Sequence, residues 1–360
     1  MENQWRHVSV FHLLFFFILT GIQVVQSSPH YYHHHRRLGG RLSKLFVFGD
    51  SYADTGNNQK PVARSWKVPY GITFPGKPAG RFSDGRVLTD YVASFLGIKT
   101  PVEWRKMEAN RLRYGPYGIN FAFGGTGVFD TVVAPDRNIT MTKQIDFFQQ
   151  LIHDGVYSKL DLDSSVALVS LAGNDYTTYS ARNGSTEGLS NFTASIINQL
   201  AINMKRIHDM GVKKVAVTAV EPFGCLPANS VLSSYQQCNE TNNKISIFHN
   251  LLLQQAVEKL NNETNESTFI ILDLYNAFIS TFERQKDHPG SLKYVNPLKP
   301  CCVGITTKDL CGEKDENGVA KYTVCQDPES AFFWDDVHPS QEGWHAVSSA
   351  LQNSLQQLSL

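Results

Sequence analysis

Residues 45–58 read LFVFGDSYADTGNN, an apolar run followed at once by a polar segment rich in glycine and asparagine. The four apolar residues at 45–48 are typical of a strand that is buried on both faces of a parallel sheet. Ser51 lies just beyond the end of this predicted strand. Because α/β folds bind their ligands at the carboxyl ends of parallel strands, Ser51 is a candidate for a chemical role.

Short apolar runs and amphipathic stretches alternate through the rest of the chain. Strands are predicted at residues 45–48, 119–123, 166–171, 214–220 and 269–272, and helices at 87–95, 141–151, 189–210, 235–260 and 341–358. This alternation favours an α/β domain with a central parallel sheet of about five strands and helices on both faces. Neither a repeat of fixed period nor a Pro/Ser-rich linker follows residue 45, so residues 43–360 are predicted to form one domain.

The charge of the chain disfavours one class of partner. Lys+Arg and Asp+Glu both number 33, which gives a formal net charge of +0, and the sequence has no block of like charge. Proteins that bind nucleic acid usually carry a basic patch or stripe. We therefore expect no nucleic-acid partner.

The N-terminal 42 residues read as a leader and a linker. Residues 1–28 have a basic start, an apolar run at 8–22 and small polar residues at 27–28, which is the pattern of a secretory signal peptide. A membrane anchor is the alternative, but the apolar run is shorter than the roughly 20 residues of a spanning helix. Residues 29–42, with four histidines, are predicted to be a disordered lead-in, with a metal-binding tail as the alternative. The protein is thus expected to be secreted, without a stable membrane anchor after signal cleavage.

The cysteines and the glycosylation sequons agree with a secretory route. An even number of cysteines is typical of disulfide-bonded proteins in an oxidising compartment, and the lack of a CxxC pair disfavours a zinc site. The six cysteines are Cys225, Cys238, Cys301, Cys302, Cys311 and Cys325. Sequons for N-glycosylation begin at Asn138, Asn183, Asn191, Asn239, Asn262 and Asn265.

An aspartate and a histidine near the C-terminus supply the partners that a serine nucleophile needs. A serine hydroxyl attacks well only when a base takes its proton and a third group holds that base in place. His338 is the predicted base, and Asp335, three residues earlier, is predicted to accept a hydrogen bond from its other ring nitrogen. Pro339 is predicted to begin the following helix, at a position where proline is tolerated.

Donors for an oxyanion are predicted at the same edge of the sheet. A glycine run follows the predicted strand at 119–123, and Asn174 follows the one at 166–171. The backbone N–H groups of Ser51 and Gly125 and the side-chain amide of Asn174 are the candidate donors, each lowering a barrier by on the order of 3 kcal/mol. Gly124 is an alternative to Gly125. Glycine at position 125 is expected to leave room for an acyl group because it lacks a Cβ.

Other interpretations of these residues are less favoured. A serine after a strand is often a helix N-cap, which is the alternative for Ser51. Residues 54–56 spell the Asp-Thr-Gly triplet of aspartic proteases, but such sites need two carboxylates and the chain has no second triplet. The GxSxG motif of α/β-hydrolases is absent. His345 is predicted to pack or lie at the surface, and Asp336 to face solvent or a loop.

Four blocks of the sequence, in this order, resemble the plant GDSL esterase/lipase family of the SGNH-hydrolase superfamily. The blocks are GDSY with ADTGNN at 49–58, NFAFGGTG at 120–127, AGND at 172–175 and WDDVHP at 334–339. The likeness runs from about residue 45 to the end and includes GRFSDGR at 80–86, GCLP at 224–227 and the two adjacent cysteines at 301–302. It implies a flavodoxin-like three-layer α/β/α sandwich.

The resemblance also implies an activity and a set of site residues. Ser51 would be the nucleophile of a serine hydrolase, with Gly125 and Asn174 completing the oxyanion hole and His338 with Asp335 completing the triad. The substrate would be a small-molecule or lipid carboxylic ester, cut without a metal or an organic cofactor. An acyltransferase that uses the same residues is the alternative, and a non-catalytic binding protein on the same scaffold is a weaker one.

Two further features follow from the resemblance. The disulfide pattern of the family would pair Cys225 with Cys238 and link the other four cysteines among themselves. The chain also departs from the family pattern, because Tyr52 occupies the position of the leucine in GDSL. We expect this departure to change packing or substrate choice without loss of activity.

Overall fold

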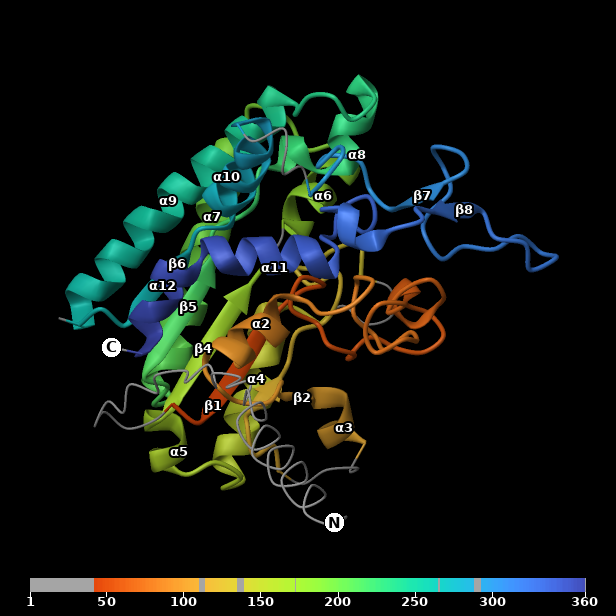
Figure 1. Cartoon of the computed structure of the whole chain (residues 1–360). Helices are drawn as coiled ribbons and strands as arrows, with labels where there is room; N and C mark the ends of the chain where they lie inside the picture. Colours follow the sequence, from red (N-terminus) through yellow and green to blue (C-terminus); the bar gives the residue numbers. More distant parts are fainter. Residues whose placement is uncertain are drawn as a thin grey trace, which may run out of the picture. The chain divides into compact units, whose positions relative to one another are not determined.

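The structure is a computed structural model, and it describes residues 42–109, 114–134, 139–171, 173–264, 266–287 and 293–359. The predicted signal peptide and nearly all of the predicted lead-in lie outside these residues. In the part of the chain that is described, six parallel strands form one sheet in the order β2-β3-β1-β4-β5-β6 (Figure 1). The strands are β1 Lys44–Gly49, β2 Val102–Glu103, β3 Ile119–Asn120, β4 Ser165–Ser170, β5 Lys214–Thr218 and β6 Phe269–Leu272.

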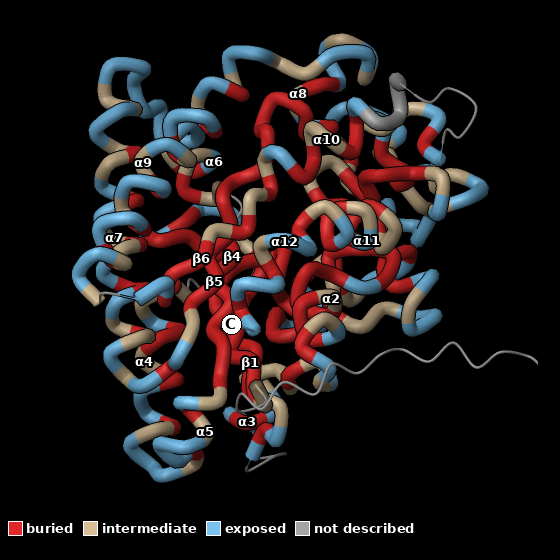
Figure 2. The backbone as a smooth tube through the Cα atoms, turned by 60° about the vertical axis from the view of Figure 1, so that its left-hand side comes forward, coloured by how far each residue is buried: buried red, intermediate tan, exposed pale blue. Residues whose placement is uncertain are grey.

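Helices cover both faces of this sheet, as predicted. Side chains alternate along β1, so Leu45 and Val47 belong to one apolar layer and Phe46 and Phe48 to the other. The layer of Leu45 is covered by α2 Leu88–Phe95, α10 Leu274–Asp287, α11 Gln341–Ala350 and α12 Gln352–Gln356. The layer of Phe46 is covered by α4 Met141–His153, α5 Lys159–Asp163, α7 Leu189–Asp209 and α9 Glu240–Thr264. Figure 2 shows the buried strands in red between helices whose outer surfaces are exposed.

The strand order places a topological switch point at β1. This strand pairs with β3 on one side and β4 on the other, and the chain crosses from β3 to β4 over it. All three strands are parallel, so the loops that follow them open at the same edge of the sheet. Ligand sites in open α/β sheets lie at such a point.

Shorter elements complete the architecture. The remaining helices are α3 Trp104–Glu108, α6 Asn174–Ala181 and α8 Pro227–Ser230. The strands β7 Cys302–Gly304 and β8 Tyr322–Val324 form a separate antiparallel pair, which extends from the sandwich in blue at the right of Figure 1. No helix in the described ranges is long and apolar enough to cross a membrane.

The six cysteines form three disulfides. Cys225 is bonded to Cys238, as the family resemblance implied. The other four are linked among themselves, Cys301 to Cys325 and Cys302 to Cys311, so the two adjacent cysteines reach different partners.

Several predicted boundaries were wrong for local reasons. The strand predicted at 119–123 ends at Asn120, because the side-chain amide of Asn57 binds the carbonyls of Asn120 and Ala122. The helix predicted from residue 235 begins at Glu240, because Ser234 and Tyr235 adopt left-handed backbone angles, with φ of 55° and 63°. β2, α6 and α10 were not predicted.

The C-terminal helix also differs from the prediction. Pro339 does not begin it, since Ser340 is the N-cap and its hydroxyl accepts the N–H of Gly343 at 2.9 Å. The predicted continuous helix at 341–358 is divided at Leu351 into α11 and α12.

Candidate active site

The fold brings the three predicted triad residues together. Ser51 follows β1, and Asp335 and His338 lie in the loop before α11. The Nε2 atom of His338 lies 2.8 Å from the Oγ atom of Ser51, and its Nδ1 atom lies 2.8 Å from Oδ1 and 2.9 Å from Oδ2 of Asp335. All three residues are buried. The arrangement has a hydroxyl, a base and an orienting carboxylate in one hydrogen-bonded line.

The three-residue spacing of Asp335 and His338 has a structural cause. The Oδ1 atom of Asp335 accepts the backbone N–H groups of Val337 and His338, at 3.0 and 2.9 Å. The aspartate thereby closes a turn with its own side chain. The N–H of Trp334 closes the loop further by donating to the carbonyl of His338 at 2.7 Å. The turn directs the imidazole back over the carboxylate.

The carboxylate of Asp335 is kept ionised by its surroundings. Burial by itself would raise its pKa, but the charge and hydrogen bond of His338, the charge of Arg64 and the hydroxyl of Tyr70 hold the pKa well below its usual range. The Tyr70 hydroxyl donates to Oδ2 at 2.7 Å. Asp335 can therefore act as a fixed negative charge beside the imidazole.

The GRFSDGR segment at 80–86 supports the imidazole from a third part of the chain. The ring of Phe82 stacks on that of His338, with centroids 5.0 Å apart and an interplanar angle of 28°. The hydroxyl of Ser83 donates to the carbonyl of Pro339 at 3.1 Å. The Oδ1 atom of Asp84 accepts the N–H of Gln341 at 2.7 Å. These contacts bind the segment to His338 and to the residues that connect it to α11.

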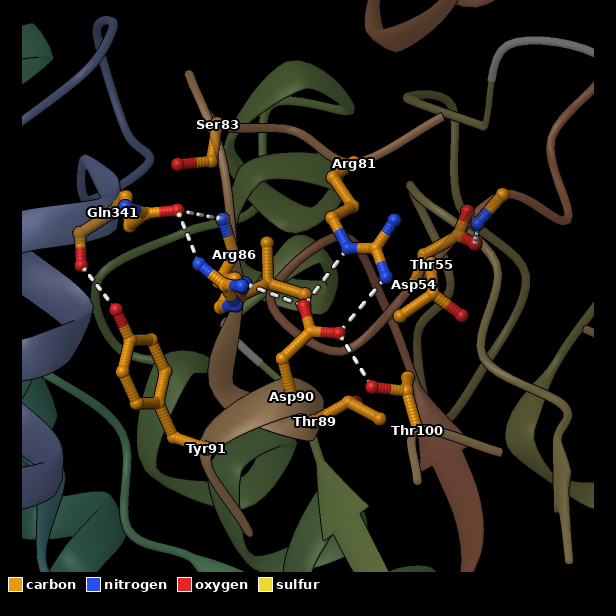
Figure 3. Close-up of polar contacts among 12 residues, drawn as sticks. Asp54, Thr55, Arg81, Ser83, Arg86, Thr89, Asp90, Tyr91, Thr100 and Gln341 are labelled. Carbon is orange, nitrogen blue, oxygen red and sulfur yellow. Dashed lines mark hydrogen bonds and ion pairs between the residues drawn. The ribbon is translucent and has the colours of Figure 1, made fainter. Parts of the chain in front are cut away.

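The segment at 80–86 is itself held by α2 and α11. Figure 3 shows Arg81 in a bidentate pair with Asp90, both contacts being 2.8 Å, while Thr100 donates to the same carboxylate. Tyr91 donates to the carbonyl of Gln341 at 2.8 Å, and the side-chain oxygen of Gln341 accepts the backbone N–H of Arg86. A bidentate guanidinium–carboxylate pair fixes direction as well as distance.

The structure distinguishes the two candidate glycines of the oxyanion hole. The N–H of Gly124 donates to Oδ2 of Asp54 at 3.1 Å. Neither the N–H of Gly125 nor that of Ser51 forms a hydrogen bond with the described residues. Burial raises the pKa of Asp54 to about 7, although its backbone donors favour the carboxylate. Of the two glycines, Gly125 has the N–H available for a ligand.

Glycine at position 125 also has a structural role within the chain. Its φ is +89°, a left-handed conformation that side chains rarely adopt. A Cβ at this position would lie 2.6 Å from Cα of Ala134 and 2.9 Å from the carbonyl oxygen of Val133. The small residue is thus required by the neighbouring loop of the chain itself.

The amide of Asn174 lies at the same edge, and its two hydrogens have acceptors. Its Nδ2 atom donates to the carbonyl of Thr126 at 2.9 Å and to Oδ2 of Asp50 at 3.1 Å. Asn174 is the first residue of α6, and it follows Gly173, whose φ is +92°. An oxyanion would have to share or replace one of these two acceptors.

The remaining predicted residues lie away from this line of side chains. His345 is exposed on α11, as predicted, and its Nδ1 atom lies 3.1 Å from Oε1 of Glu342. Asp336 is half-buried, with Arg64 at 3.8 Å. Of the sequons, those at Asn183, Asn191 and Asn262 are exposed, Asn239 is half-buried and accepts N–H groups at the start of α9, and Asn138 and Asn265 lie outside the described residues.

Three residues near the candidate site were not predicted from the sequence. Tyr70 and Phe82 come from an irregular segment. Its sequence has no periodic pattern that could indicate which side chains point toward the site. Glu221 is buried beside Tyr52, whose hydroxyl lies 3.1 Å from its Oε1 atom. A signal did exist for Glu221, since a charged residue at the end of the apolar run at 215–220 is unusual.

Comparison with known proteins agrees with this geometry. Residues 45–351 match the GDSL-like lipase/acylhydrolase family. The chain belongs to this family. As a member, it is a serine hydrolase that acts on ester bonds. This agrees with the observed pairing of Ser51 and His338 at the carboxyl edge of the sheet.

Relatives of this GDSL hydrolase span nearly its whole length. GDSL esterase/lipase At5g03610 of Arabidopsis thaliana is 54% identical over 316 residues, which are 88% of this chain and 87% of the relative. Acetylajmalan esterase 2 of Rauvolfia serpentina is 30% identical, over 87% of this chain and 91% of its own. Among solved structures, the acetylxylan esterase Axe2 of Geobacillus stearothermophilus aligns with 88% of this chain and 95% of its own, at 15% identity and a TM-score of 0.36.

Proposed function

We propose that the protein hydrolyses carboxylic esters through an acyl-enzyme intermediate on Ser51. The observation that carries the proposal is the hydrogen-bonded line from Ser51 through His338 to Asp335, with bonds of 2.8 Å at both ring nitrogens. His338 takes the proton of the Ser51 hydroxyl as its oxygen attacks the ester carbonyl. The imidazolium is stabilised by the ionised Asp335.

The rest of the reaction uses the same groups in reverse. His338 returns the proton to the leaving alcohol, which departs and leaves the acyl group on Ser51. A water molecule then gives a proton to His338 and attacks the acyl carbon, releasing the carboxylic acid and restoring the serine. The N–H groups of Ser51 and Gly125 and the amide of Asn174 stabilise the oxyanion in both steps.

The experiment for this proposal replaces Ser51 by alanine. Ser51→Ala should abolish turnover of a short-chain p-nitrophenyl ester and labelling by a fluorophosphonate, while the thermal unfolding curve keeps its shape. Ser195→Ala is the matched control, because Ser195 is exposed on α7, and it should retain full activity and labelling. Undiminished turnover by Ser51→Ala would contradict the proposal.

We also propose that the protein is secreted and N-glycosylated. The support is the signal-like sequence at 1–28, the three disulfides and the exposure of Asn183, Asn191 and Asn262. Expression in a eukaryotic secretory host should release protein whose N-terminus lies near residue 29. Treatment with peptide-N-glycosidase should lower its mass. Retention of the full chain inside the cells would contradict secretion.

A further inference from the structure

The hydroxyl of Tyr52 connects three segments behind the candidate active site. It lies 2.8 Å from the carbonyl oxygen of Val337 and 3.1 Å from Oε1 of Glu221. Tyr52 directly follows Ser51, Val337 directly precedes His338, and Glu221 follows β5. No other donor in the described residues reaches the carbonyl of Val337. Tyr52 thus links the backbone of the loop that carries His338 to a buried carboxyl group.

Counting protons assigns a state to this carboxyl group. A phenol carries one hydrogen, and a backbone carbonyl can only accept. The shorter contact, to Val337, therefore takes the proton of Tyr52. The contact between Tyr52 and Glu221 then needs a second proton, which Glu221 must supply as a neutral carboxylic acid.

The surroundings of Glu221 favour the neutral form. The residue is 1% exposed, and no Lys or Arg in the described residues pairs with it. Burial raises its pKa to about 8, and the negative charge of Asp50 adds to the increase. The other titratable groups that face the pair are Asp335 and His338, from the loop that Tyr52 contacts. Of these three neighbours, the carboxylate of Asp50 opposes ionisation of Glu221.

We propose that Tyr52 and protonated Glu221 are positioning residues for His338, and that loss of the Glu221 proton releases the loop that carries His338. The inference rests on the proposed role of His338 as the base. An ionised Glu221 could only accept, and a carboxylate is a stronger acceptor than a carbonyl. The single proton of Tyr52 would then turn to Glu221, and the carbonyl of Val337 would lose its donor.

The consequence for catalysis follows from the position of Val337. It precedes the base, so a shift of its peptide moves the imidazole relative to the Ser51 hydroxyl. Displacement of a catalytic group by about 1 Å can reduce a rate by roughly a hundredfold. The leucine of the family pattern could not form this link, because it has no hydroxyl group. The departure at Tyr52 would therefore make the rate depend on the protonation of Glu221.

Glu221→Gln is the variant that tests this link. Glutamine has the same shape as a protonated glutamate and donates a hydrogen bond at every pH. The kcat for a short-chain p-nitrophenyl ester, corrected for spontaneous hydrolysis, is measured from about pH 6 to about pH 10. In the parent protein kcat should fall by roughly tenfold or more as pH rises, with a midpoint near 8. Glu221→Gln should retain its kcat through that range, and superimposable profiles would overturn the proposal.

Tyr52→Phe is a second, independent test that does not depend on the folding of Glu221→Gln. The phenyl ring keeps its packing against Trp344, with which the tyrosine ring makes an edge contact at 5.0 Å. Without the hydroxyl, kcat should be lower at neutral pH and should no longer show the transition near 8. Adding Glu221→Gln to Tyr52→Phe should change the profile no further. A transition near 8 that persists in Tyr52→Phe would overturn the proposal.

Two controls separate this inference from the proposed function. Glu263→Gln makes the same chemical change at an exposed site on α9 and should keep the parent profile. A changed profile in that variant would overturn the attribution to Glu221. Fluorophosphonate labelling is followed at each pH. Folded protein that is not labelled at any pH contradicts the role of Ser51, whereas labelling with one pH profile in both parent and Glu221→Gln contradicts only the role of Glu221.

Discussion

The hydroxyl of Tyr70 lies 2.7 Å from the Oδ2 atom of Asp335, which is 265 residues away in the chain. Tyr70 is fully buried, so this contact is shielded from water. A hydrogen bond to a charged group contributes about 1.5–3 kcal/mol to stability, which is more than a neutral one contributes. The carboxylate of the proposed triad is therefore held by a donor from a distant loop as well as by its own histidine.

Replacing Tyr70 by phenylalanine should weaken both the fold and the reaction. The ring would keep its contacts with Phe82 and Trp334, while Asp335 would lose one donor. We expect the free energy of unfolding in urea to fall by about 1.5–3 kcal/mol, and kcat to fall by about tenfold because the carboxylate is less well fixed. Tyr114→Phe, at an exposed tyrosine, is the control. If the free energy of unfolding and the kcat of Tyr70→Phe equal those of the parent protein, the hydrogen bond has no such effect.

Asn174→Ala should reduce the chemical step much more than substrate binding. The amide is the one side-chain donor proposed for the oxyanion, and loss of such a donor reduces kcat by about 10²–10³-fold. KM should change little, because the charge that the amide stabilises develops only in the transition state. Asn198→Ala, at an exposed position on α7, provides the matched control. If Asn174→Ala folds and retains kcat within about twofold, Asn174 is not an oxyanion donor.

The parts of the site that could be predicted are those fixed by regular structure. Ser51 was identifiable because it follows a buried apolar strand, and Asn174 because it follows another strand of the same sheet. Parallel strands direct their carboxyl ends to one edge, so proximity followed from the pattern. Asp335 and His338 were identifiable by their three-residue spacing, and the structure explains this spacing by a turn that Asp335 closes.

The parts that could not be predicted depend on contacts between irregular segments. Tyr70 reaches Asp335 from a loop that has no periodic pattern, and Glu221 meets Tyr52 across 169 residues. The edge strand β2 has only two residues and is defined by its pairing with β3, Val102 with Ile119 and Glu103 with Asn120. Local propensity carries no information on such pairings, because it does not contain the partner.

Removing the disulfide between Cys225 and Cys238 should lower stability. The bond joins two residues that are 13 positions apart in the sequence. A disulfide that closes a loop of this size is expected to contribute about 3 kcal/mol by restricting the unfolded chain. The double variant Cys225→Ala and Cys238→Ala should therefore unfold at lower urea concentration, with its other two disulfides verified by mass spectrometry. A loss of less than about 1 kcal/mol would indicate that the unfolded chain is little restricted by this bond.

The buried carboxyl of Glu221 should make stability depend on pH in a predictable direction. Its pKa is raised from 4.5 to about 8 in the folded protein, so folding takes up a proton between these values. Its stabilising contribution is complete below the lower value and is lost as pH rises through the upper one, with a slope of about 1.4 kcal/mol per pH unit in between. Glu221→Gln cannot titrate, so the free energy of unfolding of the parent minus that of this variant should decrease steadily from about pH 5 to about pH 8. Urea unfolding of both proteins at each pH measures this difference, with Glu263→Gln as the exposed control. A difference that stays constant over this range would mean that Glu221 is already ionised in the folded protein, and the proton count at Tyr52 would then be wrong.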